Sequence, residues 1–391
     1  MTIEGKAESA VPRRLRLGMV GGGRGAFIGG VHRIAARMDD RYDLVAGALS
    51  ADAQRAHDSA ADLHIAPERS YADYREMARK EASRPDGIDV VAIVTPNHMH
   101  HGPARAFLDA GISVICDKPL SSTLEDALDL QRAVAASGLV FGLTHNYTGY
   151  PLVRQAREMA VSGELGTIRV VQVEYAQDWL ATKLEASGQK QAAWRTDPAR
   201  SGAAGCVGDI GTHAFNLAEF VTGLQAEQLA ADLTSFVDDR VLDDNAGMLL
   251  RFAGGARGML WASQVAVGQE NGLRLRVYGT KAGIEWAQEQ PNSLTVTPYG
   301  EPPRRIRRAG SGTSAVAAYA SRIPAGHPEG YLEAFAQLYR DLAEQITAHR
   351  EGRAPDKAAL LVPGIADGVR GMRFITASVA SSNGGGTWTK I

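Results

Sequence analysis

The chain has 391 residues, of which 45% are hydrophobic and 22% charged, as in ordinary globular proteins. Its 42 basic and 44 acidic residues give a net charge of −2, which provides no electrostatic attraction for nucleic acid or an anionic membrane. Two distant cysteines, no long apolar run and a polar start without an apolar leader segment predict a cytoplasmic protein without a disulfide scaffold.

The first part of the chain alternates short apolar runs with helical patterns. Runs that predict strands occupy residues 15–20, 42–49, 88–95, 112–116 and 139–144. Patterns that predict helices occupy residues 31–38, 52–63, 103–110 and 124–137. This alternation predicts a parallel sheet with right-handed crossovers, which we expect over residues 15–146 after a flexible tail at 1–14.

After Tyr147 strands follow one another without intervening helices. They are predicted at residues 168–178, 228–237, 246–252, 257–267, 273–278 and 294–297, separated by Gly, Asn and Pro turn signals. Helices are predicted at 152–162 and 331–350, and small residues at 309–320 and 381–386 are expected on the surface. This part, residues 147–391, therefore predicts a second domain with a mostly antiparallel sheet.

A glycine run marks a nucleotide site between the first strand and the first helix. Gly21–Gly23 would let the backbone approach a pyrophosphate, and the helix N-terminus would offer free N–H groups. Two spacings are open: the third position falls on Ala26, or, in the reading we prefer, on Gly29 after an insertion at 25–27. Arg24 lies in the same turn and is expected to contact the cofactor.

The end of the second strand bears on the choice between NAD and NADP. Ser50 occupies the position where an acid would bind the adenosine ribose, and Asp52 is also a candidate helix N-cap. Arg55 could offer charge to a 2′-phosphate. Because no basic pair immediately follows the strand, we expect NAD, with NADP left possible.

A polar loop closes the strand at 88–95. The carboxyl end of such a strand lines the ligand crevice, so Thr95, Pro96, Asn97 and His100 are expected to contact the dinucleotide. Histidines also occur at 98 and 101, but no acids or cysteines nearby complete a ligand set, and no metal site is expected.

These segments, together with Ala110-Gly111, Val114–Pro119 and Asp209–His213, resemble the Gfo/Idh/MocA oxidoreductases, the glucose–fructose oxidoreductase and inositol dehydrogenase family. The resemblance covers roughly residues 15–380. It implies an N-terminal Rossmann domain with a doubly wound parallel sheet and a C-terminal α+β domain with a large, mostly antiparallel open sheet. It also implies oxidation or reduction of sugars, cyclitols and their derivatives with NAD(P).

The resemblance implies a catalytic set of Lys118, Asp209 and His213. Oxidising an alcohol requires a base for the hydroxyl proton, which His213 can be, and positive charge beside the developing alkoxide, which Lys118 can supply. Asp209 and His213 are one helical turn apart and would share a face. Lys118 and Asp117 are also expected at the cofactor, although Asp117 replaces the Glu of the family's Glu-Lys-Pro tripeptide.

Further substrate contacts are predicted from residue type. Tyr147 follows the last strand of the first domain, and an aromatic and basic segment contains Trp179, Trp194 and Arg195. Aromatic faces suit sugar rings, although loop anchors and solvated charges explain these residues equally well. His327, just before the long helix, could cap the pocket.

Three functions are compatible with these motifs. The first is an NAD(P)-dependent sugar or cyclitol dehydrogenase. The second is a redox-neutral NAD-dependent glycosidase that oxidises C3, eliminates the aglycone, adds water and reduces again, with Lys183, Lys190 and Arg195 binding an anionic glycoside such as a sulfoquinovoside. The third is a non-catalytic dinucleotide-binding regulator. The exposed face of the C-terminal sheet predicts a homodimer or homotetramer.

Overall fold

The structure, a computed structural model, describes residues 13–391. The tail predicted at 1–14 therefore lies outside the described residues except for its last two. Arg13 forms an ion pair of 2.8 Å with Asp89, and Arg14 forms one of 2.8 Å with Asp40, so both side chains are fixed beside the first strand.

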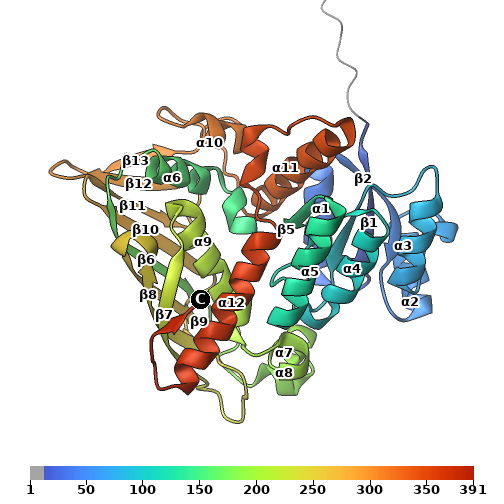
Figure 1. Ribbon diagram of the computed structural model, residues 1–391, viewed down its shortest axis with the longest axis horizontal. Helices are drawn as coiled ribbons and strands as arrows, with labels where there is room; N and C mark the ends of the chain where they lie inside the picture. The colour runs from blue at the N-terminus through green and yellow to red at the C-terminus, as the bar shows by residue number, and fades with distance from the viewer. Residues whose placement is uncertain (1–12) are drawn as a thin grey trace, which may run out of the picture.

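Two sheets organise the molecule and lie on opposite sides of it (Figure 1). The first has five parallel strands in the order β2-β1-β3-β4-β5. Its strands are β1 (Leu15–Gly21), β2 (Tyr42–Ala48), β3 (Val90–Val94), β4 (Ser113–Cys116) and β5 (Phe141–Leu143). The helices between them are α1 (Phe27–Met38), α2 (Ala53–Asp62), α3 (Tyr74–Ser83), α4 (His101–Asp109) and α5 (Leu124–Ser137).

The parallel sheet is covered on both faces, which explains the continuous apolar run of β3. Val90 and Ala92 belong to the same core as α1 and a late helix, α11 (Tyr331–Glu351). Val91 and Ile93 point to the other core, which α3, α4 and α5 share. All five residues of β3 are buried. The predicted doubly wound parallel sheet is confirmed.

The second sheet has nine strands in the order β13-β12-β11-β10-β6-β9-β8-β7-β14. All its neighbours pair antiparallel except β6 and β9, which are parallel, so the prediction of a mostly antiparallel sheet is confirmed. The strands are β6 (Ile168–Ala176), β7 (Ala226–Thr234), β8 (Asn245–Phe252), β9 (Arg257–Ser263), β10 (Gly272–Gly279), β11 (Ala282–Ala287), β12 (Ser293–Pro298), β13 (Arg304–Arg307) and β14 (Thr389–Lys390).

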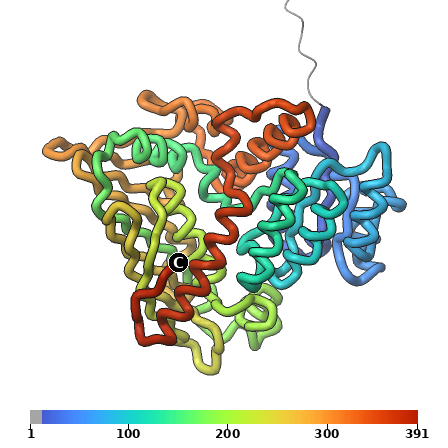
Figure 2. The backbone as a smooth tube through the Cα atoms, in the orientation of Figure 1, coloured from blue at the N-terminus to red at the C-terminus, as the bar shows by residue number. Residues whose placement is uncertain are grey.

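Helices from the second half join the two sheets. They are α6 (Pro151–Val161), α7 (Lys190–Arg195), α8 (Pro198–Ser201), α9 (Thr212–Thr222), α10 (Ala315–Ala320), α11 and α12 (Ile365–Asn383). Figure 2 shows the red C-terminal stretch passing from α11, which packs on α1, through the middle of the molecule to the edge of the nine-stranded sheet, and α12 on this path packs on both α5 and β7.

The small-residue stretches predicted on the surface are partly buried instead. Residues 315–320 form α10, in which Ala317 and Ala320 are fully buried and which packs against α6. Ser381 is also buried, and its hydroxyl accepts from the backbone N–H of Ala231. Small side chains here permit close helix packing rather than exposure. Within residues 13–391, no helix carries an apolar stretch long enough to cross a bilayer.

Candidate functional site

The glycine run after β1 forms a close-packed turn. Gly21 and Gly22 have φ of +80° and +75°, values that L side chains rarely adopt. A Cβ on Gly29 would lie 2.4 Å from the Cα of Gly22, and one on Gly23 would lie 2.7 Å from the carbonyl oxygen of Leu49. The structure thus gives Gly29, in the first turn of α1, the close-packing role expected of the third glycine.

The start of α1 offers unpaired N–H groups to a ligand. Ala26 precedes the helix and provides no side-chain cap. A cavity of about 380 Å³ opens there, and its lining includes Gly22, Gly25, Phe27 and Arg33. An uncapped N-terminus with a positive dipole end beside such a hollow suits the pyrophosphate of a dinucleotide, so the residues present fit this group.

The residues expected at the adenosine end are partly engaged with each other. Asp52 caps α2 by accepting from the backbone N–H of Arg55, and the Ser50 hydroxyl accepts from the N–H of Asp52. Arg24 pairs with Asp58 at 3.0 Å and with Asp62 at 2.6 Å. The Arg55 side chain remains exposed at the start of α2.

The loop after β3 is held by polar contacts that fix the crevice. The two ring nitrogens of His100 lie 2.8 Å from the carbonyl oxygens of Thr95 and Pro119. These contacts join the loop that contains Pro96 to the segment that follows Lys118. The Asn97 amide donates to the carbonyl of Ser201 in α8 at 3.1 Å. His101 turns away and pairs with Asp129.

Lys118 and Asp209 form the centre of the site. The Lys118 ammonium donates to both the backbone carbonyl and the Oδ1 of Asp209, each at 2.8 Å. The other carboxylate oxygen accepts from Arg195 Nε at 3.1 Å and from Gln264 Nε2 at 2.9 Å. Asp117 precedes Lys118, and its Oδ1 accepts from the backbone N–H of Lys118.

Charge sets the protonation state of Asp209. Burial opposes ionisation, but the positive charges of Arg195 and Lys118 outweigh it and hold the pKa of Asp209 well below its ordinary value. The carboxylate is therefore ionised at neutral pH. Because an ammonium has three donors and Asp209 takes two from Lys118, one donor is left for a substrate oxygen.

Two buried histidines face each other beside Lys118. The Nδ1 atoms of His213, in α9, and His145, after β5, are 3.4 Å apart. Burial and the charge of Lys118 lower the pKa of His145 to about 3 and the pKa of His213 well below its usual range. Both rings are thus neutral at rest, and a hydrogen bond between them makes one Nδ1 a donor and the other an acceptor.

An aromatic cluster adjoins His213. The ring of Tyr147 meets that of His213 edge-on with 4.8 Å between centroids, and its hydroxyl bonds the hydroxyl of Tyr175. Tyr175 donates in turn to Asn271 at 2.7 Å. Asn271 and Tyr331 line a cavity of about 760 Å³ with further amides and carboxylates, the groups that recognise hydroxyls.

The aromatic and basic segment reaches Asp209 from a third direction. The guanidinium of Arg195 lies 4.3 Å from the Trp194 ring centroid and 5.9 Å from that of Trp179. Lys183, by contrast, pairs with Asp239 on the surface. His327 lies on an exposed turn where its carbonyl accepts from Arg308, and the residues that follow it, Pro328 to Gly330, line the same cavity as Asn271 and Tyr331.

The structure adds residues that pattern reading did not single out. His145 follows the carboxyl end of β5, and Gln264 directly follows β9. Position after a strand end was a usable signal for His145, since the crevice of a parallel sheet lies there. Gln264 had no comparable signal, because its approach to Asp209 depends on packing between elements far apart in the chain.

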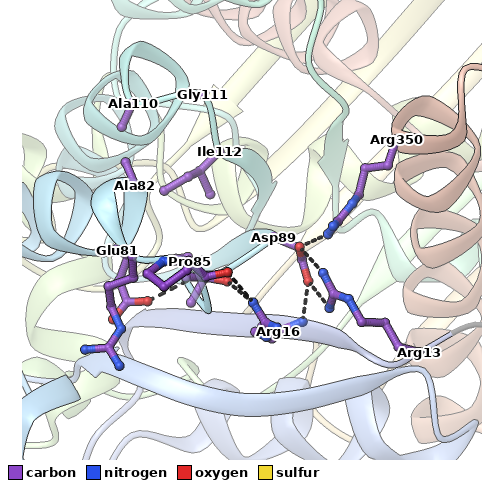
Figure 3. Close-up of a pocket in the computed structure, with 13 residues that line it drawn as sticks. Arg13, Arg16, Glu81, Ala82, Pro85, Asp89, Ala110, Gly111, Ile112 and Arg350 are labelled. Atoms are coloured by element: carbon purple, nitrogen blue, oxygen red, sulfur yellow. Dashed lines mark hydrogen bonds and ion pairs between the residues drawn. The ribbon is translucent and has the colours of Figure 1, made fainter.

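A second polar hollow, of about 450 Å³, lies at the opposite edge of the parallel sheet, where β1, β3 and β4 begin. Figure 3 shows Arg13 and Arg350 converging on Asp89, which also accepts from the backbone N–H of Arg16 at 2.7 Å. These contacts join the end of α11 to the first strand and lie away from the carboxyl edge, where ligands bind in such sheets.

Comparisons with known proteins agree with this geometry. A family model described as an oxidoreductase family with an NAD-binding Rossmann fold matches residues 15–145, and the GFO/IDH/MocA C-terminal domain model matches residues 153–285. An oxidoreductase from Sinorhizobium meliloti is 54% identical with a TM-score of 0.88, over 97% of this chain and 100% of that one.

Two further proteins carry named ligands or substrates. An inositol dehydrogenase homologue from Azotobacter vinelandii, solved with NADH and myo-inositol, is 39% identical with a TM-score of 0.89, over 97% of this chain and 98% of that one. A levoglucosan dehydrogenase from Pseudarthrobacter phenanthrenivorans is 29% identical over 73% of this chain and 76% of its own length. The chain belongs to the Gfo/Idh/MocA family and is an NAD-binding oxidoreductase of it.

Proposed function

We propose that this chain is an NAD-dependent dehydrogenase that oxidises a secondary hydroxyl of a sugar, a cyclitol or a sugar derivative. The observation that carries the proposal is the Lys118–Asp209 pair, whose 2.8 Å contacts leave one ammonium donor free beside two neutral buried histidines. The inositol- and levoglucosan-acting relatives support the substrate class.

Lys118 and Asp209 would orient the reacting hydroxyl. The remaining Lys118 donor would bind the substrate oxygen and stabilise the negative charge that grows on it. Asp209, fixed by Arg195 and Gln264, holds the ammonium in place. NAD, when bound, supplies the hydride-accepting chemistry in the oxidative direction.

His213 would take the hydroxyl proton. If its Nδ1–H donates to the Nδ1 of His145, then its Nε2 has a free lone pair. That nitrogen accepts the proton as the C–H bond breaks, and His145 would hold the ring in the required tautomer. The lowered pKa keeps the His213 ring unprotonated, and so free to accept a proton, throughout the neutral pH range, while it also makes the ring a weaker base than an exposed histidine.

The test is NADH production by the full-length protein on a panel that includes myo-inositol, levoglucosan and common monosaccharides. We expect turnover on at least one polyol. Lys118→Ala and His213→Ala should each reduce kcat roughly 10²–10⁴-fold, the range for loss of an acid–base or charge-stabilising group. Undiminished turnover in both variants would refute these roles.

The alternative glycosidase function loses its main support, because the three cations proposed for an anionic glycoside have separate surroundings. Lys183 pairs with Asp239, Arg195 pairs with Asp209, and Lys190 lies near the glycine turn. Nitrophenol release from an aryl glycoside, with catalytic NAD and no net NADH, would restore the glycosidase hypothesis.

The other alternative, a non-catalytic regulator, would bind NADH tightly and turn over no substrate of the panel.

We also propose that residues 15–146 act as the cofactor domain and residues 147–391 as the substrate domain.

We further propose that the protein self-associates through the outer face of the nine-stranded sheet. The side chains of Leu249, Met259 and Trp261 point outward from β8 and β9 and are 52%, 44% and 40% exposed. Such an apolar patch is a natural dimer surface. Light scattering should give a dimer or tetramer for the natural chain and a monomer for Met259→Glu/Trp261→Glu; a monomeric natural chain would contradict the proposal.

A further inference from the structure

Helix α7 connects the glycine turn with Asp209. At its C-terminal end Arg195 donates to the Asp209 carboxylate at 3.1 Å. At its N-terminal end the Lys190 ammonium lies 3.8 Å from the position that a Cβ on Gly25 would occupy. The two cations are five residues apart on a six-residue helix, so one short element lies beside the nucleotide turn at one end and bonds the Asp209 carboxylate at the other. Figure 1 places α7 and α8 between the two sheets, at the lower edge of the view.

The arginines at the glycine turn are already hydrogen-bonded to protein groups. Arg24 is neutralised by Asp58 and Asp62, which together outweigh it by one negative charge. Arg33 is directed to the carbonyl oxygen of Gly22 at 2.6 Å. The turn therefore offers N–H dipoles to a pyrophosphate, and Arg33, which lines the same cavity and forms no ion pair within residues 13–391, keeps its charge while it is bonded to a backbone carbonyl.

Lys190 adds a further cation beside the turn. Its side chain is exposed, and among residues 13–391 no carboxylate forms an ion pair with it. Gly25 has φ of +78° and no side chain, so nothing stands between its backbone and the ammonium. A phosphate bound over the N-terminus of α1 would meet that ammonium from the opposite side.

We propose that Lys190 binds the pyrophosphate of NAD across the glycine turn, so that α7 clamps the cofactor from the second half of the chain. The proposal depends on the NAD-binding fold and not on the substrate, so it stands or falls separately from the proposed dehydrogenase activity.

Cofactor titration of the full-length protein tests this contact. NADH binding should weaken about five- to tenfold in Lys190→Ala, the loss expected for one partly exposed charge contact to phosphate, and should largely recover in Lys190→Arg. Lys183→Ala is the matched control, since Lys183 is exposed in the same segment but pairs with Asp239. Equal NADH affinity in the natural chain and in Lys190→Ala would overturn the proposal.

Two further measurements locate the contact. ADP-ribose keeps the pyrophosphate but lacks the nicotinamide, so Lys190→Ala should weaken ADP-ribose and NADH by the same factor. A loss confined to NADH would place Lys190 at the nicotinamide instead and contradict the assignment. Raising the ionic strength should weaken NADH binding less in Lys190→Ala than in the natural chain, because the screened charge is gone. An unchanged salt dependence would also count against it.

Discussion

The two edges of the parallel sheet carry ion clusters of similar composition but different character. At the carboxyl edge Asp209 binds Lys118 and Arg195, and these side chains are only 14–23% exposed. At the amino edge Asp89 binds Arg13 and Arg350, which are each 44% exposed (Figure 3). Both clusters join the first part of the chain to the second.

The difference between the edges lies in their neighbours and not in their charges. Asp209 is surrounded by titratable groups whose pKa values burial has displaced, among them His213 and His145. Asp89 is surrounded by backbone and by arginines that water also reaches. Displaced pKa values in a crevice mark a functional site, whereas a polar hollow alone does not.

Paired substitutions should separate the two clusters most clearly. Asp209→Asn removes the charge that holds Lys118, and we expect kcat to fall about 10²–10³-fold. Asp89→Asn should leave kcat within about threefold and lower the free energy of unfolding by about 2 kcal/mol, because partly exposed arginines lose their shared partner. Steady-state kinetics and urea unfolding measure both effects. A large loss of kcat in Asp89→Asn would contradict the assignment of the Asp89 cluster to stability and not to catalysis.

Burial predicts a pH effect of intermediate size. Burial lowers the pKa of His32 to about 4, against opposition from Asp117, with Arg33 and His100 also nearby and Tyr339 bonded to its Nδ1. Above pH 6.5 neither the folded nor the unfolded chain protonates this ring, but between 6.5 and about 4 only the unfolded chain does. The free energy of unfolding should therefore decrease as the pH is lowered, and this residue alone should remove about 2 kcal/mol between pH 7 and pH 5.

The variant His32→Gln checks that assignment, since the amide can keep the bond to Tyr339 but does not titrate. Urea unfolding between pH 7 and pH 5 should show a shallower decline of stability in the variant. Parallel declines in the two proteins would show that His32 is not a source of the acid sensitivity.

The smallest effect should come from His145, which acts through His213. We expect His145→Ala to lower kcat about tenfold, with NADH affinity unchanged, because His213 loses the partner that sets its tautomer. His145→Asn should restore most of the rate, since its side-chain oxygen can stand near the lost Nδ1. Equal rates in the Ala and Asn variants would assign His145 a packing role only.

The sequence was informative where chemistry is local. The parallel sheet was predicted from the alternation of short apolar runs with helical patterns. The place of Gly29 as the third position of the turn was predicted from the spacing of the glycines. Asp209 and His213 were predicted on one helical face, and the structure places Asp209 in a π-helical turn (Val207–Gly211) that leads directly into α9. Their function, like that of the other predicted contacts, stays a prediction for the experiments above.

The features that were missed depend on contacts between distant segments. α10 reads as a small-residue loop because its burial depends on α6, and β11 and β13 are short strands that follow their neighbours in the sheet. His327 was predicted near the pocket from its place before α11; its turn is bonded to Arg308 and continues into residues that line the cavity of Asn271 and Tyr331, and its contact with substrate stays a prediction. Spacing along the chain gave no information about such partners.

The packing of α11 against the parallel sheet has a consequence for how the protein is made. Phe335, Leu342 and Ile346 cover the face that includes Leu17 and Met19, yet they are synthesised some three hundred residues later. A nascent chain that has emerged as far as β5 has α1 on this face but lacks α11, and thus presents a partly uncovered apolar face to the ribosome exit and to chaperones. We expect a fragment ending near residue 146 to aggregate unless the helix is supplied alongside it.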